Sequence, residues 1–497
     1  RQTKPAIAPL KVRAHPGYMV TALVLCDALC LSVAGIASVY IRLWFNGQYA
    51  PSLYWELWPL LGLFLLGYGL AGLYPGHGIG PVEELRRLSL TMTLLYLTLG
   101  SAIFLFRDLE LYSRAVFLMA WGLSIILPLL GRYGLRALVA KRSWWGYPVL
   151  VLGAGETGAL VIRTLHRQPT LGLKPVAVLD DDVTKHGSLE GVPVIGNLAQ
   201  APVLANRDQI PYAIMAMPGV HRDRLLYVAQ RYGRAFPHLL IIPDLFGMAS
   251  LWVAARDLGG VLGLESRQQL LLPGPKLAKS LLDNCLTFLV GIVCLPLIAL
   301  IALTIRLDSP GPIFYAQVRI GRKGRPFKAW KFRTMVPNAD KVLKEYLHRQ
   351  PELRNHWDQD RKLKYDPRIT RVGRWLRRTS LDELPPLRNV LRGEMSLVGP
   401  RPIVHDEVRR YADKFELYIQ VLPGLTGLWQ VSGRNNITYE ERVNLDAYYV
   451  RNWSVWLDLY ILIRTVWVVL MGDGAYLFSS IYRKVSDDST HAARMAM

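Results

Sequence analysis

The chain has 497 residues, too many for one hydrophobic core, and hydrophobic residues make up 51% of it. Its formal net charge of +21 at pH 7 favours anionic partners such as lipid or phosphorylated substrates. No recognition motif for nucleic acid accompanies the charge, and the four cysteines lack the spacing of metal ligands. We therefore expect no nucleic-acid partner, no zinc site and no disulfide framework.

Four apolar runs dominate the first third of the chain. They cover residues 18–41, 55–74, 88–106 and 115–130. Each is about as long as a membrane-crossing helix, which needs about 20 residues. Basic residues precede the first run and follow the fourth, among them Lys11, Arg13, Arg132 and Arg136. Since such residues favour the cytoplasmic side, we expect a four-helix membrane anchor over residues 18–142 with both ends in the cytoplasm.

Asp27 places a carboxylate inside the first of these runs. A charge at membrane depth is costly and often has a function. A carboxylate held between helices or near the interface explains it equally well, so both interpretations stay open.

Residues 147–158 read Tyr-Pro-Val-Leu-Val-Leu-Gly-Ala-Gly-Glu-Thr-Gly, which predicts a buried strand, a tight turn and the start of a helix. Gly153, Gly155 and Gly158 match the G-x-G-x-x-G spacing of dinucleotide-binding folds. Further strand-like runs follow, so we expect a Rossmann-like parallel α/β domain over residues 147–265. The glycines could hold a pyrophosphate or simply allow close helix–sheet packing, and the sequence favours neither.

Two enzyme classes are compatible with such a domain. A sugar-nucleotide dehydratase or epimerase needs a Tyr-x-x-x-Lys pair, and none of the 24 tyrosines has a lysine four residues later. A metal-dependent glycosyltransferase could use Asp180-x-Asp182 or Asp358-x-Asp360 to hold a diphosphate-bound cation. Such short acidic patterns are common in loops. The first class is therefore disfavoured, and the second stays as an alternative.

Residues 281–307 form another apolar stretch, interrupted by Pro296. Basic residues flank both ends, including Lys276, Lys279, Arg306 and Arg319. Both flanks therefore favour the cytoplasm, and the proline should break the helix near its midpoint. We expect a re-entrant helix–break–helix hairpin; the alternative is a kinked helix that crosses completely.

Arginine and lysine are frequent in residues 317–335. Part of this stretch can act as a polybasic collar at anionic lipid. Arg319 and Arg333 are better candidates for binding phosphate, because a guanidinium donates two parallel hydrogen bonds.

Asp382 and Glu383 are adjacent carboxylates in a strongly basic segment. Ser380 and Glu383 match a helix-capping box, which is the structural interpretation of the pair. Pro385, however, lies too deep for a helix capped at Ser380 and fits better at the first helical position. Both carboxylates would then precede a helix N-terminus, which favours an ionised, nucleophilic Asp382 and a bound anion nearby.

Four segments follow one another in the last third of the chain. They are Lys331-Phe-Arg-Thr-Met335, Arg378-Thr-Ser-Leu-Asp-Glu-Leu-Pro385, Met395-Ser-Leu-Val-Gly-Pro-Arg-Pro402 and Pro423-Gly-Leu-Thr-Gly-Leu-Trp-Gln-Val-Ser-Gly-Arg434. Together they resemble the bacterial sugar transferases, which are monotopic phosphoglycosyl transferases that act on polyprenyl phosphates. The resemblance covers residues 276–476, and long members of the family also carry a four-helix anchor and a nucleotide-fold domain. Smaller members have Ser-Pro where this chain has Leu295-Pro296.

The resemblance implies a catalytic domain over residues 276–476, mainly α-helical, on the re-entrant helix 281–307, followed by a tail, 477–497. It implies that Asp382 is the nucleophile and that Glu383 binds Mg²⁺. We expect Arg319 and Arg401 to clamp phosphate. Asp458 could simply pair with Arg464 or Arg451, but the resemblance implies that it is needed at the active site, where it could orient an arginine. The further substrate-binding candidates are Lys331, Arg333, Arg378 and Arg434.

The resemblance also implies the substrates and the location. Such enzymes move a sugar 1-phosphate from a UDP-sugar to undecaprenyl phosphate and release UMP, at the cytoplasmic face of the bacterial inner membrane. The three-part layout is most similar to members that transfer galactose 1-phosphate at the start of O-antigen synthesis, with glucose as the alternative sugar. A homodimer through the parts outside the membrane is plausible.

Overall fold

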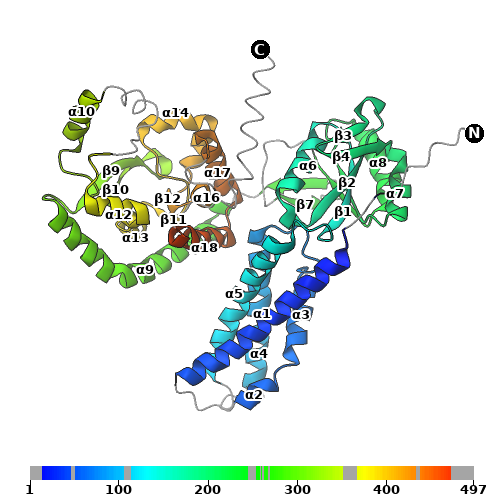
Figure 1. Cartoon of the computed structure of the whole chain (residues 1–497), viewed down its shortest axis with the longest axis horizontal. Helices are drawn as coiled ribbons and strands as arrows, with labels where there is room; N and C mark the ends of the chain where they lie inside the picture. The colour runs from blue at the N-terminus through cyan, green and yellow to red at the C-terminus, as the bar shows by residue number, and fades with distance from the viewer. Residues whose placement is uncertain are drawn as a thin grey trace, which may run out of the picture. The chain divides into compact units, whose positions relative to one another are not determined.

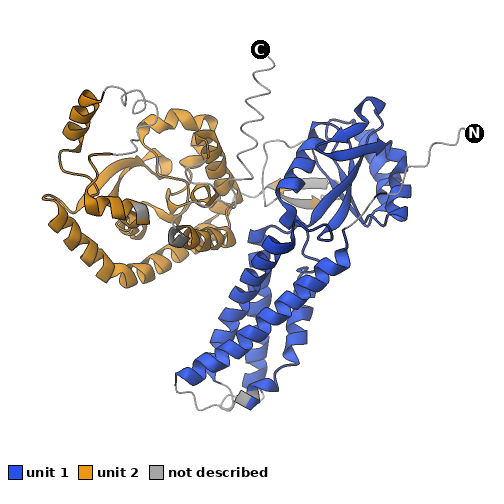
Figure 2. Cartoon of the chain, in the orientation of Figure 1, with its two compact units in different colours: residues 1–247 blue, residues 248–497 orange. Residues whose placement is uncertain are grey.

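The computed structural model describes residues 10, 14–45, 51–105, 113–243, 253–257, 259, 262–266, 269–350, 366–432 and 437–471. The chain divides into two compact units, unit 1 over Arg1–Gly247 and unit 2 over Met248–Met497 (Figure 2). Unit 1 contains the N-terminal apolar helices and a parallel sheet. Unit 2 contains the four segments that resemble sugar transferases.

Unit 1 begins with a bundle of helices (Figure 1). These are α1 (Pro16–Trp44), α2 (Pro51–Trp55), α3 (Leu60–Leu70), α4 (Pro81–Leu105) and α5 (Arg114–Val139). Within the described ranges, four helices are long and apolar enough to cross a membrane: α1, α4, α5 and, in unit 2, α9 (Pro273–Asp308).

The second predicted span differs from the expectation. Residues 55–74 form the end of α2, a turn and the 11-residue helix α3. Pro59 precedes α3 as its N-cap, and Gly72, with φ of +69°, follows its end. A helix of that length covers about 17 Å, roughly half of the hydrocarbon layer. Among the described residues, the anchor therefore has three full-length helices, α1, α4 and α5, and two short ones, α2 and α3.

Asp27 belongs to a buried ionic network between the helices. Arg132 Nη2 lies 2.6 Å from Asp27 Oδ2, and Arg132 Nη1 lies 2.9 Å from Glu84 Oε1. Tyr74 Oη donates a hydrogen bond to Asp27 Oδ2 at 2.6 Å. Asp27 and Arg132 are both fully buried. The structure thus supports the interpretation of Asp27 as a carboxylate held between helices.

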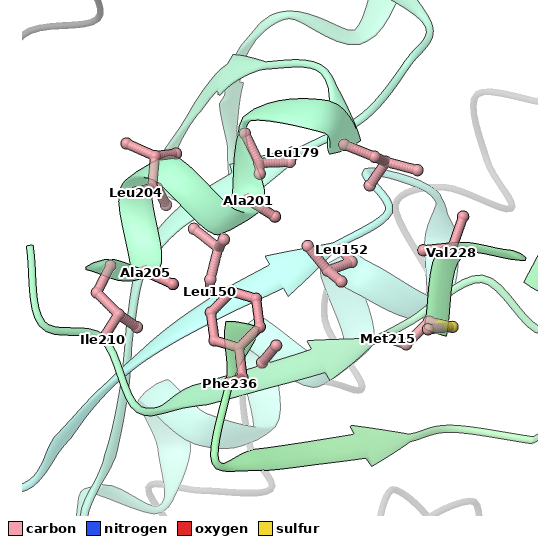
Figure 3. Packing of buried hydrophobic residues seen from close by; sticks show 13 residues of the cluster. Leu150, Leu152, Leu179, Ala201, Leu204, Ala205, Ile210, Met215, Val228 and Phe236 are labelled. Carbon is pink, nitrogen blue, oxygen red and sulfur yellow. The ribbon is translucent and has the colours of Figure 1, made fainter. Parts of the chain in front are cut away.

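A six-stranded sheet follows, with the strand order β3-β4-β2-β1-β5-β6. Its strands are β1 (Tyr147–Leu152), β2 (Leu173–Leu179), β3 (Gly187–Leu189), β4 (Val192–Gly196), β5 (Tyr212–Met215) and β6 (His238–Ile241), with helices α6 (Glu156–Arg167), α7 (Ala201–Arg207) and α8 (Arg222–Arg231). All neighbouring strands pair in parallel except β3 and β4 at one edge. The prediction of a parallel α/β sheet is confirmed. Leu150, Leu152 and Met215 of the sheet pack with Leu204 and Phe236 in its core (Figure 3).

The membrane helices meet the sheet at the amino-terminal ends of its strands. Gly78 N, in the loop before α4, donates to Leu171 O at 2.8 Å, just before β2. His77 Nε2 hydrogen-bonds Tyr212 Oη at the start of β5. The glycine loop follows β1 and therefore lies at the opposite, carboxyl edge, where open α/β sheets bind ligands.

The membrane helix of unit 2 is α9, with 36 residues. The expected break at Pro296 is wrong, because the helix runs continuously through the proline. A proline removes one backbone hydrogen bond and can bend a membrane helix without ending it, and α9 is drawn as a curved helix in Figure 1. Ile301 and Ile305 in its second half pack against Phe332 and Leu376.

The remaining elements of unit 2 are short. The strands are β7 (Val253–Asp257), β8 (Leu262–Ser266), β9 (Phe314–Ile320), β10 (Pro326–Phe332), β11 (Ser396–Val398) and β12 (Gly424–Thr426). The helices are α10 (Ala339–Arg349), α12 (Arg371–Thr379), α13 (Leu387–Leu391), α14 (Val408–Tyr411), α15 (Phe415–Tyr418), α16 (Leu428–Ser432), α17 (Tyr439–Asn452) and α18 (Val455–Met471). The strands form three two-stranded sheets, β7–β8, β9–β10 and β11–β12. The β7–β8 hairpin falls within the range 147–265 expected for the Rossmann-like domain, but it is part of unit 2.

Candidate active site

Asp382 and Glu383 lie in a short 3₁₀ turn between α12 and α13. Ser380 just before them has φ of +58°, and its side chain makes no capping hydrogen bond, so the predicted capping box does not form. The next α-helix begins at Leu387, two residues after the expected Pro385. The expectation that Pro385 occupies the first helical position is therefore wrong, and both carboxylates lie in the 3₁₀ turn that precedes α13.

Lys331, near the end of β10, contacts both carboxylates. Its Nζ lies 2.6 Å from Glu383 Oε1 and 3.8 Å from Asp382 Oδ2. Arg377 of α12 is close enough for its charge to act on Asp382, and its Nε donates to Thr334 Oγ1 at 2.9 Å. Two cations therefore stand beside the carboxylates, as an anionic substrate requires.

Burial raises the pKa of Asp382 above its usual value, and the charge of Glu383 raises it as well. The charges of Lys331 and Arg377 lower this pKa, but the net direction is upward. The direction is opposite to the one that a helix N-terminus alone would give. The side chain of Asp382 is only 14% exposed, and α13, with five residues, is too short to supply a large dipole. Once ionised, the carboxylate has few solvating groups around it, which favours its attack on an electrophile.

Arg319 and Arg401 form a second cationic group. Arg319 Nη1 donates to Pro402 O at 3.2 Å, one residue beyond Arg401. Burial lowers the pKa of Arg319, and the charge of Arg401 lowers it as well. Within the described part of the chain, the Arg401 guanidinium has no hydrogen bond or ion pair, and its Cζ lies 5.4 Å from the centre of the Trp429 ring. The two predicted phosphate clamps thus come together, with Arg401 available to an anion.

Lys331 and Arg319, one from each cationic group, share one face of the β9–β10 hairpin. Lys331 pairs with Tyr315, and Phe327 pairs with Arg319, in a regular antiparallel register. Because alternate residues of a strand point to the same face, Lys331 and Arg319 lie on one side of the hairpin. Four residues of strand separate these positions, about 13 Å at about 3.3 Å per residue. The long side chains of both arginines can reach across part of that distance.

Arg333 is engaged by the chain itself. Its guanidinium donates to Ser309 O at 2.7 Å and to Pro310 O at 2.8 Å, in the segment after α9. It therefore fixes the exit of the membrane helix, and its binding of substrate stays a prediction. So do the roles of Arg378, of which the structure describes only the backbone in α12, and of Arg434, which lies outside the described residues.

Asp458 of α18 is held in a buried network rather than beside the clamps. Lys279 Nζ lies 2.7 Å from Asp458 Oδ2, and Tyr449 Oη donates to Asp458 Oδ1 at 2.7 Å. Asp283, also on α9, accepts a hydrogen bond from Ser396 Oγ at 2.6 Å at the start of β11. The ion-pair partner seen for Asp458 is thus a lysine, not the arginine that was expected. The network ties α9 to α18 and to the strand that leads into Gly399–Pro402.

A local pattern in the sequence indicates part of this network. Lys279 and Asp283 lie four residues apart on α9, the spacing at which side chains share a helix face, at the start of an apolar stretch. The basic flank predicted from Lys279 does not include Asp283, which is the second charged residue of the pair.

No set of three or more His, Cys, Asp or Glu side chains in the described ranges could form a metal cage. Mg²⁺, however, usually takes only one or two carboxylates from the protein and completes its shell with water and substrate phosphate. Glu383, whose side chain is 37% exposed, fits that role beside Asp382. Of the two alternative acidic patterns, Asp180-x-Asp182 is engaged within its own loop, since Asp182 accepts a hydrogen bond from Thr184 N. Asp358-x-Asp360 lies outside the described residues.

The glycine loop of unit 1 is closely packed. A Cβ at Gly153 would lie 2.9 Å from a backbone oxygen, and one at Gly158 would lie 2.2 Å from Gly153 O. Asp180, which follows β2, accepts a hydrogen bond from Ala154 N within the loop at 2.7 Å. These contacts favour the packing interpretation of the glycines, and a cofactor bound there stays a prediction.

Two family models match the chain. Residues 275–472 match the bacterial sugar transferase model, and residues 70–243 match the model of a CoA-binding domain. The first range contains the carboxylates, the cationic groups and α9.

Three characterised relatives are similar over most of the chain. A UDP-galactose-lipid carrier transferase of Erwinia amylovora is 38% identical over 370 residues, 73% of this chain and 76% of the relative. An undecaprenyl-phosphate galactose phosphotransferase of Salmonella typhimurium is 36% identical over 374 residues, 73% of this chain and 77% of the relative. A UDP-glucose:undecaprenyl-phosphate glucose-1-phosphate transferase of Escherichia coli is 34% identical over 337 residues, 66% of this chain and 68% of the relative.

Proposed function

The chain belongs to the bacterial sugar transferase family, and on that premise we propose that it transfers a hexose 1-phosphate from a UDP-hexose to undecaprenyl phosphate and releases UMP. The observation that carries this function is the pair Asp382 and Glu383 beside Lys331, inside the matched range. Two of the relatives above are named for galactose and one for glucose. Galactose is therefore the first candidate, with glucose as the alternative, and the product would start a lipid-linked polysaccharide.

The transfer would proceed in two steps through Asp382. An oxygen of the ionised Asp382 carboxylate attacks the sugar-bearing phosphorus of the UDP-hexose, and the bond from that phosphorus to UMP breaks. The bonding electron pair leaves with UMP. A phosphate oxygen of undecaprenyl phosphate then attacks the same phosphorus and displaces the Asp382 carboxylate, which regenerates the enzyme. Two large substrates thus never have to react with each other directly.

The neighbouring side chains would handle charge. Lys331 and Arg377 act on the carboxylates from β10 and α12, where they can neutralise the diphosphate as it approaches. Arg319 and Arg401 would bind phosphate oxygens farther along the hairpin face. Glu383 would hold Mg²⁺, which supplies charge neutralisation on the diphosphate when bound.

For the location we propose the bacterial inner membrane, with unit 2 on its cytoplasmic side and α9 as a re-entrant helix. Basic residues at both ends of α9, Lys276 and Arg306, support this arrangement, since both flanks favour the same side. A single cysteine at the exposed Arg322, after α9, can be compared with one at the exposed Val203 of the parallel-sheet domain, in a background without the four native cysteines. Labelling of both from the cytoplasm is expected. Labelling of the Arg322 position from the periplasm would refute the re-entrant arrangement.

Product analysis tests the function in one assay. Purified protein with UDP-galactose, undecaprenyl phosphate and Mg²⁺ should release UMP, and UDP-glucose should be tested in parallel. Release of UDP instead would indicate a glycosyltransferase, and release of neither nucleotide would contradict an enzymatic role in this transfer. The Asp382→Asn variant is the control, since it should release no UMP.

A further inference from the structure

A closed circuit of contacts begins at Arg401 and ends at its neighbour Pro402. The Arg401 and Arg442 guanidinium carbons lie 5.4 and 5.5 Å from the centre of the Trp429 ring. Arg442 Nη2 lies 3.4 Å from Glu407 Oε1. Glu407 Oε2 lies 3.8 Å from Arg319 Nη1, and the same Arg319 nitrogen donates to Pro402 O at 3.2 Å.

The circuit carries an excess of positive charge. It contains three guanidinium groups, from Arg319, Arg401 and Arg442, and one carboxylate, Glu407, which Arg319 and Arg442 share. The buried Asp446 is a second carboxylate nearby. Burial raises the pKa of Asp446 to about 7, although the charge of Arg442 and a hydrogen bond from the Arg401 backbone lower it. Three guanidinium groups thus face one carboxylate and a second one whose ionisation burial opposes, which favours an added anion at Arg401.

The aromatic member of the circuit is deeply buried. Trp429 is 7% exposed and Arg442 is 8% exposed. In the part of the chain that the structure describes, Trp429 Nε1 and Arg442 Nε are buried donors without a hydrogen-bond partner. A guanidinium against an indole ring in such a desolvated place is held more firmly than one at an exposed surface. The contact therefore restricts where the Arg401 side chain can point.

We infer that Trp429 and Arg442 are positioning residues that hold the Arg401 guanidinium in place for a substrate phosphate. Trp429 contacts Arg401 directly, and Arg442 supports the ring from α17 while it shares Glu407 with Arg319. The two phosphate-binding arginines are thereby linked through a single set of contacts. The inference rests on the proposed function, because it assumes that Arg401 binds a phosphate of the UDP-hexose.

A double-mutant cycle separates positioning from simple packing. The variants are Trp429→Leu, Trp429→Phe, Arg401→Gln and the double variant Trp429→Leu/Arg401→Gln, each assayed for UMP release from UDP-hexose at high enzyme concentration. Loss of the ring should lower kcat/KM about tenfold, in the range of a buried cation–π contact, and phenylalanine should restore most of that loss. In the Arg401→Gln background, Trp429→Leu should cost less than a further twofold, because the group that it positions is already gone.

A matched control removes a guanidinium from another aromatic ring. The Arg224 guanidinium carbon lies 5.6 Å from the centre of the Tyr227 ring in unit 1 and is not part of the circuit, so Arg224→Gln should leave UMP release unchanged. Arg442→Gln breaks the circuit but leaves the Trp429 side chain unchanged. If Trp429→Leu does not fold, Arg442→Gln and Arg401→Gln provide a second double-mutant cycle that makes the same test. If the positioning substitution lowers kcat/KM by the same factor with and without the Arg401 guanidinium, the inference is overturned. Wild-type protein that releases no UMP would overturn the proposed function and the inference together, whereas wild-type release with independent effects overturns the inference alone.

Discussion

Asp382 and Glu383 are neighbours in sequence but differ in environment. The Asp382 side chain is 14% exposed and the Glu383 side chain is 37% exposed, and Lys331 lies closer to the glutamate than to the aspartate. A buried carboxylate suits attack on phosphorus, and a more exposed one suits a metal ion that keeps water and phosphate ligands. The difference in burial thus supports the separate roles that we propose for the two acids.

The raised pKa of Asp382 gives a prediction for the pH dependence of the first step. Only the ionised carboxylate attacks, so the rate should fall as the pH drops through this raised pKa. Lys331 lowers the pKa of Asp382, so removing its charge by Lys331→Met should move the acid limb of the profile to higher pH. The position of the limb in single-turnover UMP release, rather than the maximal rate, is the quantity to compare. A limb that moves to lower pH would contradict this account.

The same raised pKa predicts how Asp382→Asn affects stability. A carboxyl group whose pKa is higher in the folded than in the unfolded chain destabilises the fold as it ionises, so the cost appears as the pH rises above the unfolded value. The asparagine variant should therefore gain thermal stability relative to wild type between pH 5 and pH 8, although it loses activity. Thermal unfolding at both pH values measures this difference. A difference that shrinks toward pH 8 would show that Asp382 is stabilised as an anion.

Several site residues could be predicted from the sequence, and others could not. Asp382, Glu383, Arg319 and Arg401 stand in recognisable motifs, and the structure brings the two carboxylates together and the two arginines together. The pairing of Lys279 with Asp458 joins positions far apart in the chain, and it depends on how α9 packs against α18. Local spacing carries no information on such packing.

At the scale of elements, buried charge in the anchor has a structural role. Asp27 and Arg132 are fully buried partners, so among the described residues removing Asp27 leaves Arg132 with only Glu84, a carboxylate that Arg136 also shares. Asp27→Ala should destabilise unit 1 by about 3–5 kcal/mol, whereas the double variant Asp27→Leu/Arg132→Met should recover most of the loss. Denaturation of the purified protein in detergent measures both.

Ser32 on the same helix offers a control for this prediction. Its hydroxyl bonds only to Ala28 O within α1, so Ser32→Ala should change stability little. If Asp27→Ala were as mild as Ser32→Ala, the ionic network would not hold the helices together.

Secondary structure could be predicted where the hydrophobic periodicity of a segment and its length indicate the same kind of element. The strands of the parallel sheet match the apolar runs, because a central parallel strand is buried on both faces and reads as a continuous hydrophobic segment. The predictions of a full-length second span and of a helix break at Pro296 were wrong, at α3 and α9. An apolar run does not tell whether turns divide it, as happens before α3, and Pro296 does not break a helix whose second half is packed against Phe332 and Leu376.

At the scale of the whole molecule, two kinds of unit share one chain. The sugar transferase model matches residues 275–472, whereas the galactose-named relatives align over 73% of the chain. The similarity therefore extends beyond the residues that would carry the chemistry. Unit 1 contributes an anchor and a sheet whose glycine loop is closed by Asp180, and the residues to which we assign the reaction all lie in unit 2.

The central claim is that Asp382 carries the sugar phosphate between the two substrates. Protein incubated with UDP-hexose labelled in the sugar, without undecaprenyl phosphate, and then digested for peptide mass spectrometry tests it most directly. We predict one hexose phosphate on the peptide that contains Asp382, formed together with UMP, and no such adduct in Asp382→Asn. An adduct that persists in the asparagine variant, or UMP release by that variant at the wild-type rate, would contradict the account.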